Sequence, residues 1–440
     1  YLKRHVNPAE AESVLEYNWK GVHGVEEFHR YYPAAEVATH LVGFNNVDDQ
    51  GQEGMELAYD VWLQGTSGKK VVQKDRTGRT VKDLKLLSNA EPGKDLNLSI
   101  DLRMQYVAYR ELKAVVQQHQ ASSGSAVVLD VQTGEILAMV NQPAYNPNNR
   151  SIMNIDSLRN RALTDVLEPG STMKPLTIAA ALMSGQYDLD SKVDTSPGFI
   201  KVKRKTIRDH RNYGVLDITG IITKSSNVGV TKLALSLPDN SVRETFYSFG
   251  LGQATASGFP GESAGILPSY PKWNPINLAT MSYGYGIAVT PVQLAQAYGV
   301  FASYGLKRPV SILKQEQVPE AERVMPEHLA KQVVAMLETV TQKGGTGTRA
   351  RVPLYRVAGK TGTVHKPSKE GGYDDDVYAA VFAGMAPASK PRLVCVVIID
   401  NPKGEQYYGG EVAAPVFSRI MTESLRLLNV APDNLLPSPG

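Results

Sequence analysis

The 440-residue chain contains a single cysteine, Cys395, so it can form no internal disulfide. It also lacks any apolar run near the ~20 residues that a membrane-spanning helix needs. Its 47 lysines and arginines nearly balance its 44 aspartates and glutamates, and a net charge of +3 argues against a nucleic-acid partner. The eight histidines show no zinc-binding spacing, so we expect neither a metal nor another cofactor. Disulfide scaffolds, membrane-embedded folds and nucleic-acid-binding proteins are therefore disfavoured.

The chain length and one stretch of chain-breaking residues predict two domains. At ~100–200 residues per domain, two or three fit, and the best boundary signal is the polar Pro-Gly stretch at 89–94. We predict a loop-rich N-terminal domain over 1–93 and a second domain over 94–440. The first contains two helix-like segments and a strand pair. These segments are Ala34–Leu41, Gly54–Leu63, Lys69–Lys74 and Arg79–Leu87.

The second domain reads as α+β. Helical periodicity is expected over Leu102–Gln118, between about Asp217 and Leu313, and over Pro415–Leu428. Strand signals fall at Ser125–Val131, Glu135–Val140, Tyr355–Val364, Val377–Met385 and Leu393–Asp400. Strands at both ends of the domain would form one antiparallel sheet flanked by the first and last helices, with the helical middle packed beside it as a lobe.

A serine and a lysine three residues apart, Ser171 and Lys174, follow a Pro-Gly break and precede an apolar helical run. Residues three apart share a helix face, so the lysine amine can lie near the serine hydroxyl. Pro175 lacks the N–H that would bond the Ser171 carbonyl, which predicts an irregular or 3₁₀ first turn. A lysine activates a serine only when neutral, and this requires burial or a second cation nearby.

Two further motifs supply matching chemistry. Ser225 and Asn227 stand in a loop between helical runs, where a hydroxyl can relay a proton and an amide can bind a substrate. Lys360, Thr361, Gly362 and Thr363 open the late strand block. Lys360 would be the second cation, the threonine hydroxyls can bind a carboxylate, and Gly362 lets a ligand backbone approach. The backbone N–H groups of Thr363 and Ser171 would form an oxyanion hole.

The order Ser-x-x-Lys, Ser-x-Asn, Lys-Thr-Gly is the signature of the penicillin-recognising acyl-serine transferases. Other segments resemble the class B penicillin-binding proteins, and in particular their division-specific (septal) transpeptidases. The resemblance covers nearly the whole chain, its N-terminal part more loosely. The segments are Arg30–Pro33, Glu53–Trp62, Asn141–Pro143, Tyr145–Pro147, Asn160–Ala162 and Tyr407–Gly410.

The resemblance implies a five-stranded antiparallel sheet with a helical lobe, and a pedestal-like N-terminal domain. It implies that Ser171 is acylated by the penultimate D-alanine of a peptidoglycan stem peptide, and that a neighbouring stem's amine then accepts the acyl group. Lys174 would be the base. Ser225, Asn227 and Lys360 would orient groups and move protons, and Thr361 and Thr363 would hold the terminal carboxylate. Tyr285 and Tyr407 would form an aromatic wall, although core packing explains either tyrosine equally well.

The same resemblance implies β-lactams as inhibitors. It also implies a glycosyltransferase and other division proteins as partners of the N-terminal domain. The family sits at the periplasmic face of the cytoplasmic membrane, held by a single-pass anchor that this sequence does not contain.

Several alternatives remain at this point. A β-lactamase would need a Glu-x-x-x-Asn segment after the Ser-x-Asn motif, and the sequence has none. A D,D-carboxypeptidase stays open, because the choice between water and amine depends on the shape of the cleft. A β-lactam sensor or a structural division scaffold would retain the fold without turnover. The Gly-x-Ser-x-Gly match at 261–265 lacks the required strand and helix, so we expect a loop there.

Overall fold

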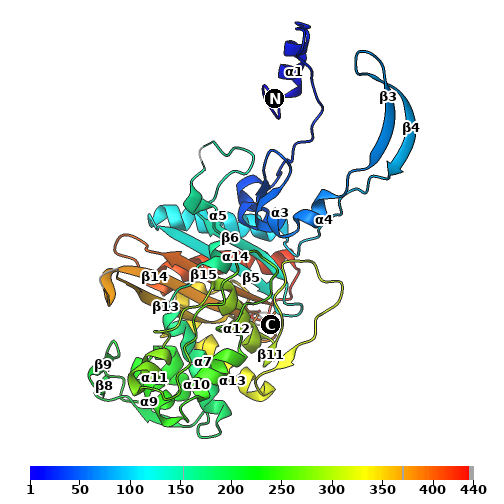
Figure 1. The fold of residues 1–440 in the computed structure, drawn as a ribbon. Coiled ribbons are helices and arrows are strands. Elements are labelled where there is room, and N and C mark those ends of the chain that lie inside the picture. Colours follow the sequence, from blue (N-terminus) through cyan, green and yellow to red (C-terminus); the bar gives the residue numbers. More distant parts are fainter. Residues whose placement is uncertain (152, 369–370, 436–440) are drawn as a thin grey trace, which may run out of the picture. The chain divides into compact units, whose positions relative to one another are not determined.

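The computed structural model describes residues 1–151, 153–368 and 371–435, which divide into two compact units (Figure 1). One unit comprises residues 1–97 and 145–158, and the other comprises residues 98–144 and 159–440. The domain boundary after Gly93 stays a prediction. Segment 145–158 was not expected to group with the N-terminal residues, because it lies far from them in sequence.

The N-terminal unit is built from short elements. The predicted single helix over Gly54–Leu63 is wrong, because the chain leaves helical geometry at Tyr59, where φ is −118°. After this break the Asp60 carboxylate accepts a hydrogen bond from the Gly51 N–H at 2.8 Å. The elements are α1 (Pro8–Leu15), the 3₁₀ helix η1 (Ala35–Val37), α2 (Thr39–Val42), β1 (Phe44–Asn45), β2 (Gly51–Glu53), α3 (Gly54–Ala58), α4 (Asp60–Gln64), β3 (Lys69–Lys74), β4 (Thr80–Ser88) and η2 (Ile155–Ser157).

A small aromatic cluster explains why segment 145–158 belongs to this unit. Tyr145 packs with Tyr32 and Phe44, and partly buried Val42, Met153 and Leu158 surround them. The Tyr145 hydroxyl donates to the Thr39 carbonyl at 3.3 Å.

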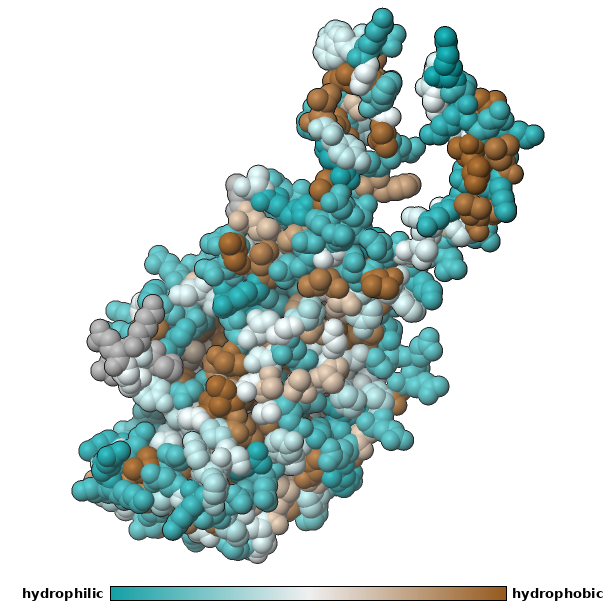
Figure 2. Space-filling view, in the orientation of Figure 1, coloured by the Kyte–Doolittle hydropathy of each residue, from teal (hydrophilic) through white to brown (hydrophobic). Residues whose placement is uncertain are grey.

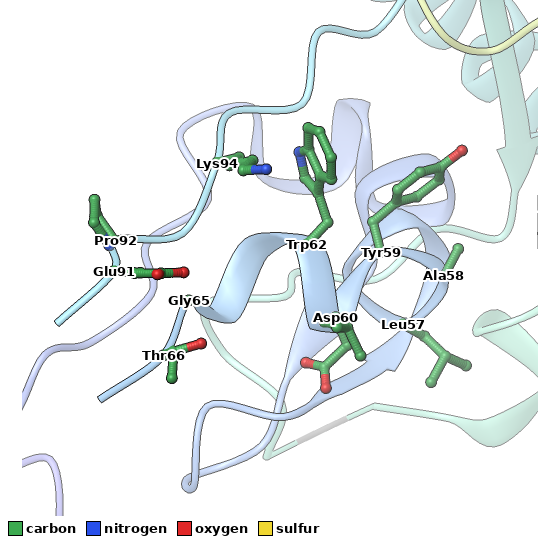
Figure 3. A pocket seen from close by; sticks show the side chains of 11 residues that line it. Leu57, Ala58, Tyr59, Asp60, Trp62, Gly65, Thr66, Glu91, Pro92 and Lys94 are labelled. Atoms are coloured by element: carbon green, nitrogen blue, oxygen red, sulfur yellow. The ribbon is translucent and has the colours of Figure 1, made fainter. Parts of the chain in front are cut away.

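A cavity of about 490 Å³ also lies within this unit, beside α4 (Figure 3). Trp62 and Lys94 both line this cavity, and the Lys94 ammonium lies 4.5 Å from the centre of the Trp62 ring.

The second unit is organised on a five-stranded sheet in the order β13-β14-β15-β5-β6, antiparallel throughout, which confirms the predicted fold. Every residue of β5 is buried, and so is nearly every residue of β15, so both faces of the sheet must be covered. Helices α5 and α14 pack on one face and α12 on the other (Figure 1). The strands are β5 (Ser123–Asp130), β6 (Ile136–Gln142), β13 (Ala358–Pro367), β14 (Tyr373–Ala386) and β15 (Leu393–Asp400); the helices are α5 (Leu102–Gln118), α12 (Pro291–Ala302) and α14 (Gly409–Leu427).

The last helix begins six residues earlier than predicted. Pro415 was expected near the start of this helix, but it lies inside α14, which begins at Gly409. Val412, Ala413 and Ala414 are buried, and their burial outweighs the backbone hydrogen bond that a proline inside a helix cannot donate.

Between about Asp217 and Leu313 the helical lobe follows the predicted pattern of helices joined by loops, and the segment 261–265 is a loop as expected. Its elements are α6 (Arg161–Thr164), η3 (Gly170–Met173), α7 (Lys174–Met183), β7 (Lys192–Asp194), β8 (Phe199–Val202), β9 (Lys205–Arg208), β10 (Val215–Asp217), α8 (Ile218–Lys224), α9 (Asn227–Ser236), α10 (Ser241–Ser248), α11 (Pro275–Met281), β11 (Leu306–Lys307), β12 (Glu322–Arg323), α13 (Glu327–Thr341) and η4 (Thr348–Ala350). Helix α13, over Glu327–Thr341, lies beyond Leu313 and was not predicted. Among the described residues, no helix is long and apolar enough to cross a membrane. Cys395 is fully buried in β15.

Candidate active site

The turn that carries Ser171 is 3₁₀, as the proline pattern predicted. Residues Gly170–Met173 form η3, and α7 continues from Lys174. The Ser171 carbonyl accepts from the Lys174 N–H, three residues on, because Pro175 has no N–H to offer it. The tight turn places Ser171 at the start of a buried helix, where backbone N–H groups lack intrahelical partners.

Lys174 is fully buried, and its amine donates to the Ser225 carbonyl at 2.5 Å and to the Ser225 hydroxyl at 3.0 Å. Burial, and then the positive charge of Lys360, hold the pKa of Lys174 well below its usual range, while Asp209 acts in the opposite direction. In the described part of the chain, the Ser171 hydroxyl has no hydrogen-bond partner. A neutral amine that uses both N–H groups on Ser225 retains a lone pair for the serine proton.

Lys360 lies on β13, which is an edge strand of the sheet, and it is also fully buried. Burial lowers its pKa to about 7. Its amine donates to the Thr361 carbonyl at 3.1 Å. Because the two lysines influence each other, protonation of one disfavours protonation of the other.

Ser225 and Asn227 flank a sharp turn between α8 and α9. Ser225 has φ 57° in the left-handed region, and Ser226 caps α9 through a 2.8 Å bond from the Gly229 N–H. The Asn227 side-chain N–H group donates to the Arg208 carbonyl at 3.0 Å. This hydrogen bond holds the loop between α8 and α9 to the end of strand β9.

The Asp209 carboxylate is the centre of that connection. It accepts from the Ser226 hydroxyl and the Asn227 N–H, each at 2.6 Å, and from the Val228 N–H at 3.0 Å. A negative charge at the N-terminus of α9 is stabilised by the helix dipole. Sequence reasoning missed Asp209, because no local pattern marks a carboxylate 18 residues before the loop that it holds.

Three glycines let the β13 edge, the nucleophile turn and the 283–286 loop approach one another. A Cβ on Gly362 would lie 3.0 Å from the Pro169 carbonyl oxygen and 3.1 Å from Thr172. Gly170 has φ +55°, and a Cβ there would lie 2.6 Å from a Val364 methyl group. Gly284, at φ +86°, would place a Cβ 2.1 Å from the Gly170 carbonyl oxygen. Gly284 therefore tolerates no side chain without displacing the turn that carries Ser171, and at Gly170 and Gly362 a side chain would require neighbouring atoms to shift.

Both threonine hydroxyls of β13 keep a proton available for a ligand. Thr363 Oγ1 accepts from the Gly409 N–H at 3.0 Å, so its own proton remains free to donate. Thr361 Oγ1 lies 2.8 Å from Thr346 Oγ1, and either hydroxyl can donate. When Thr346 donates, the Thr361 proton can also point to a carboxylate.

Of the two predicted wall tyrosines, Tyr285 contacts β13 at His365, which is half-buried, and Tyr407 is connected to His365 through Tyr378. Burial raises the pKa of Tyr285, and a bond to the His365 backbone partly opposes this rise. The Tyr407 ring stacks on Tyr378 at 4.3 Å, and Tyr378 packs against His365 at 4.6 Å.

Glu168, three residues before Ser171, joins the nucleophile segment to the 283–286 loop and to the start of β14. Its Oε1 accepts from the Gly286 N–H at 2.6 Å and the Tyr373 hydroxyl at 3.1 Å. Its Oε2 is buried without a partner among the described residues. Burial raises the pKa of Glu168, and the charge of Lys205 works against that rise. No role was predicted for Glu168, although it stands directly before the Pro-Gly break.

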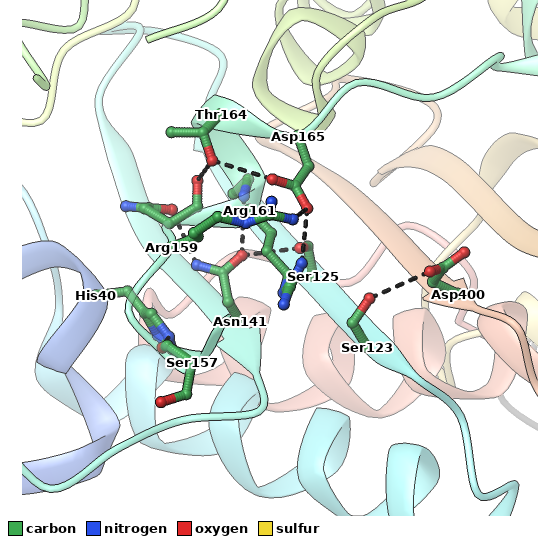
Figure 4. Close-up of polar contacts among 12 residues, drawn as sticks. His40, Ser123, Ser125, Asn141, Ser157, Arg159, Arg161, Thr164, Asp165 and Asp400 are labelled. Atoms are coloured by element: carbon green, nitrogen blue, oxygen red, sulfur yellow. Dashed lines mark hydrogen bonds and ion pairs between the residues drawn. The ribbon is translucent and has the colours of Figure 1, made fainter. Parts of the chain in front are cut away.

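A polar network anchors the same segment to the sheet (Figure 4). Asn141 of β6 accepts from the Ser125 hydroxyl at 2.8 Å and from the Ala162 N–H at 2.9 Å. Arg161 pairs with Asp165 at 2.8 Å. A cavity of about 310 Å³ is lined by Ser125, Arg161 and Asp165 of this network and by residues of β13. The network gives a structural role to Asn141 and Arg161, whose segments carried the family resemblance.

Comparison with known proteins identifies the family. A family model of the penicillin binding protein transpeptidase domain matches residues 124–422, and a model of the penicillin-binding protein dimerisation domain matches residues 1–98. Peptidoglycan D,D-transpeptidase FtsI of Escherichia coli (strain K12) is 46% identical over 435 residues, covering 99% of this chain and 73% of that protein. Probable peptidoglycan D,D-transpeptidase PbpC of Pseudomonas aeruginosa is 44% identical over 440 residues, covering 100% of this chain and 78% of that protein.

A solved structure agrees with these relatives. The apo structure of the TP domain from Burkholderia pseudomallei penicillin-binding protein 3 matches with a TM-score of 0.71 and 43% identity, covering 78% of this chain and 99% of that chain.

The fold and the three-motif site define an acyl-serine transferase of the penicillin-recognising type. The chain belongs to the penicillin-binding protein transpeptidase family. The predicted resemblance to the division-specific class B proteins is confirmed, as is the predicted enzyme class, a peptidoglycan D,D-transpeptidase. The D,D-carboxypeptidase alternative is not favoured by these relatives.

Proposed function

We propose that this protein cross-links peptidoglycan stem peptides during septum synthesis through an acyl-enzyme on Ser171. The observation that carries the proposal is the setting of Lys174, one 3₁₀ turn from Ser171. This lysine is fully buried, has a lowered pKa, and donates hydrogen bonds to the carbonyl and the hydroxyl of Ser225. These are the conditions under which a lysine acts as a base for a serine hydroxyl.

In the first half-reaction the Lys174 amine takes the Ser171 proton as Oγ attacks the carbonyl carbon of the penultimate D-alanine. The backbone N–H groups of Ser171 and Thr363 bind the resulting oxyanion; the Ser171 N–H belongs to a helix start, where such groups are unpaired. The C–N bond to the terminal D-alanine then breaks. Ser225 gives its hydroxyl proton to the leaving amine and takes a proton from Lys174, to which it is hydrogen-bonded, so Lys174 is neutral again and an ester on Ser171 remains.

In the second half-reaction the amine of a neighbouring stem attacks the ester carbonyl. Its proton moves to Lys174, the bond to Ser171 Oγ breaks, and Oγ regains a proton from the lysine. The new amide bond joins the two stems. Lys360 keeps the resting Lys174 amine neutral before each step, because its charge opposes protonation of Lys174.

Binding of the donor stem uses groups on both sides of Ser171. Asn227 orients the stem's amide from the α8–α9 loop, and Thr361 and Thr363 hold its terminal carboxylate with their free protons. At Gly362, which has no side chain, the extended stem peptide lies alongside the backbone of β13. Tyr285 and Tyr407 limit the width of the site at the end of β13 near His365.

The relatives' names and the family also suggest a setting for the reaction. We place the enzyme at the periplasmic face of the bacterial cytoplasmic membrane, held by an N-terminal single-pass anchor. The N-terminal unit contacts a glycosyltransferase and other division proteins, and β-lactams inhibit the enzyme by acylating Ser171. No nucleic acid and no cofactor take part.

The direct test is intact mass spectrometry after incubation with a slight excess of benzylpenicillin. A single adduct that persists for hours, and is absent in Ser171→Ala, supports the proposal. An adduct that disappears while penicillin is consumed would instead indicate a β-lactamase. No adduct at all would show that the site is not assembled and would reject the role of Ser171.

A further inference from the structure

A strongly basic stretch comprises β8, β9 and the residues after them, 199–211, here called the basic hairpin. It contains six lysines and arginines and one acidic residue, Asp209, in a chain whose net charge is only +3. All six cations are exposed, and none forms an ion pair within the described part of the chain. They are Lys201, Lys203, Arg204, Lys205, Arg208 and Arg211.

Such a cluster differs from the ordinary charged surface of this protein. Some exposed lysines elsewhere pair with carboxylates, as Lys70 does with Asp83 at 2.9 Å and Lys331 with Glu327 at 2.6 Å, whereas the six neighbouring cations of the basic hairpin have no such pair among the described residues. Unpaired like charges on a two-stranded hairpin repel one another, and bound anions would remove that repulsion. The lower left of the surface in Figure 2, where Figure 1 labels β8 and β9, is correspondingly hydrophilic.

The basic hairpin is connected to the active site at two points. Its Arg208 carbonyl accepts from the Asn227 side chain at 3.0 Å, and Asp209 holds the backbone of the same loop. At the other point, the charge of Lys205 partly opposes the burial-driven rise in the pKa of Glu168, just before the nucleophile turn. The basic hairpin is therefore attached to the loop that carries Ser225 and Asn227.

We propose that the basic hairpin binds the carboxylate-rich stem peptides of a glycan strand while Ser171 acts on one of them. This inference rests on the proposed function. Stem peptides repeat along a strand and carry several carboxylates, so a row of cations without carboxylate partners in the described part of the chain, attached to the Ser225 and Asn227 loop, matches their charge. Exposed charges also speed encounter with an anionic strand, an effect that salt suppresses.

The test measures binding of soluble, uncross-linked glycan strands with pentapeptide stems to full-length Ser171→Ala protein, which cannot consume them. In that background, the triple variant Lys201→Gln, Arg204→Gln, Lys205→Gln should bind roughly tenfold more weakly, since each exposed charge contact contributes modestly. A matched control neutralises Lys74, Arg76 and Arg79, which are equally exposed on the β3–β4 hairpin. We expect this control to bind like its parent.

Two further measurements need no variant of the basic hairpin. Parent binding should weaken as salt rises, and strands with amidated stem carboxylates should bind as weakly as the triple variant binds ordinary strands. Equal binding by triple variant and parent would overturn the inference, and so would equal loss in the control. If the triple variant loses binding to phosphatidylglycerol vesicles but binds glycan strands like its parent, the inference is overturned in favour of a membrane surface. The absence of a penicillin adduct in wild-type protein rejects the proposed function instead, so the two failures are distinguishable.

Discussion

At the scale of single residues, the reactivity of Ser171 depends on the proton balance at Lys174. Three influences act on that amine: burial and Lys360 lower its pKa, and Asp209 raises it. Asp209 does not contact the substrate in our mechanism, so we regard it as a positioning residue. Its contacts with Ser226, Asn227 and Val228 hold the loop that carries Ser225.

We predict that, in a plot of the penicillin acylation rate against pH, Asp209→Asn moves the fall in rate on the acid side (the acid limb) to lower pH. Removing the negative charge removes the only named influence that raises the pKa of Lys174, so the amine stays neutral in more acidic solution. Stability should also fall by about 1 kcal/mol, because the first turn of α9 loses a charged cap. The measurement is the second-order acylation rate between about pH 5 and 9.

Asp239→Asn, at an exposed position, is the matched control and should keep the wild-type profile. A purely structural role for Asp209 would lower the rate uniformly without moving the limb. A limb that stays in place or moves to higher pH would contradict the electrostatic role.

At the scale of elements, the site exists because three backbone segments meet almost without side chains between them. The Gly170 N–H donates to the Gly284 carbonyl at 3.1 Å, and Gly362 of β13 faces the Pro169 carbonyl. The edge strand, the nucleophile turn and the 283–286 loop thus form one unit. The sequence explanation for Gly362 was ligand access, whereas in the structure its missing Cβ also admits the nucleophile turn.

We predict that Gly284→Ala slows penicillin acylation and destabilises the fold. Gly185→Ala is its control, because Gly185 has a similar positive φ of +71° but no atom within 4 Å of the point that a Cβ would occupy. Both variants share the cost of an unfavourable φ, so their difference isolates the contact with the Gly170 carbonyl. We expect the free energy of unfolding to fall about 1–3 kcal/mol further in Gly284→Ala. Denaturant unfolding and the acylation rate test this, and equal losses in the two variants would contradict it.

At the scale of the whole molecule, two fully buried lysines make stability depend on pH. The unfolded chain holds their protons up to a pKa near 10.5, whereas burial lowers the pKa of Lys360 to about 7 in the folded protein. Between those values the unfolded state binds more protons, so the free energy of unfolding rises with pH. Lys174, whose pKa is also lowered, contributes with the same sign.

Lys360→Met should therefore flatten the rise in stability between about pH 7 and pH 9. The reduction is at most about 1.4 kcal/mol per pH unit, the limit for one proton. The variant should be no less stable than wild type at pH 7, since a buried charge is replaced by an apolar group. Thermal unfolding at several pH values measures both. Lys343→Met, at an exposed position, should keep the wild-type slope, and identical slopes for Lys360→Met and wild type would refute the assignment.

The sequence by itself determined the features that local chemistry controls. Helical periodicity placed α5 at Leu102–Gln118, and Pro175 predicted the 3₁₀ turn at Ser171, because both depend on neighbours within one turn. The order of the three motifs identified the family. Only the tertiary structure decided the electrostatics of the site and the start of α14. Packing between distant segments, which no local pattern encodes, produces three of these features. It buries Lys174, brings Asp209 into contact with the α8–α9 loop, and places Pro415 inside α14.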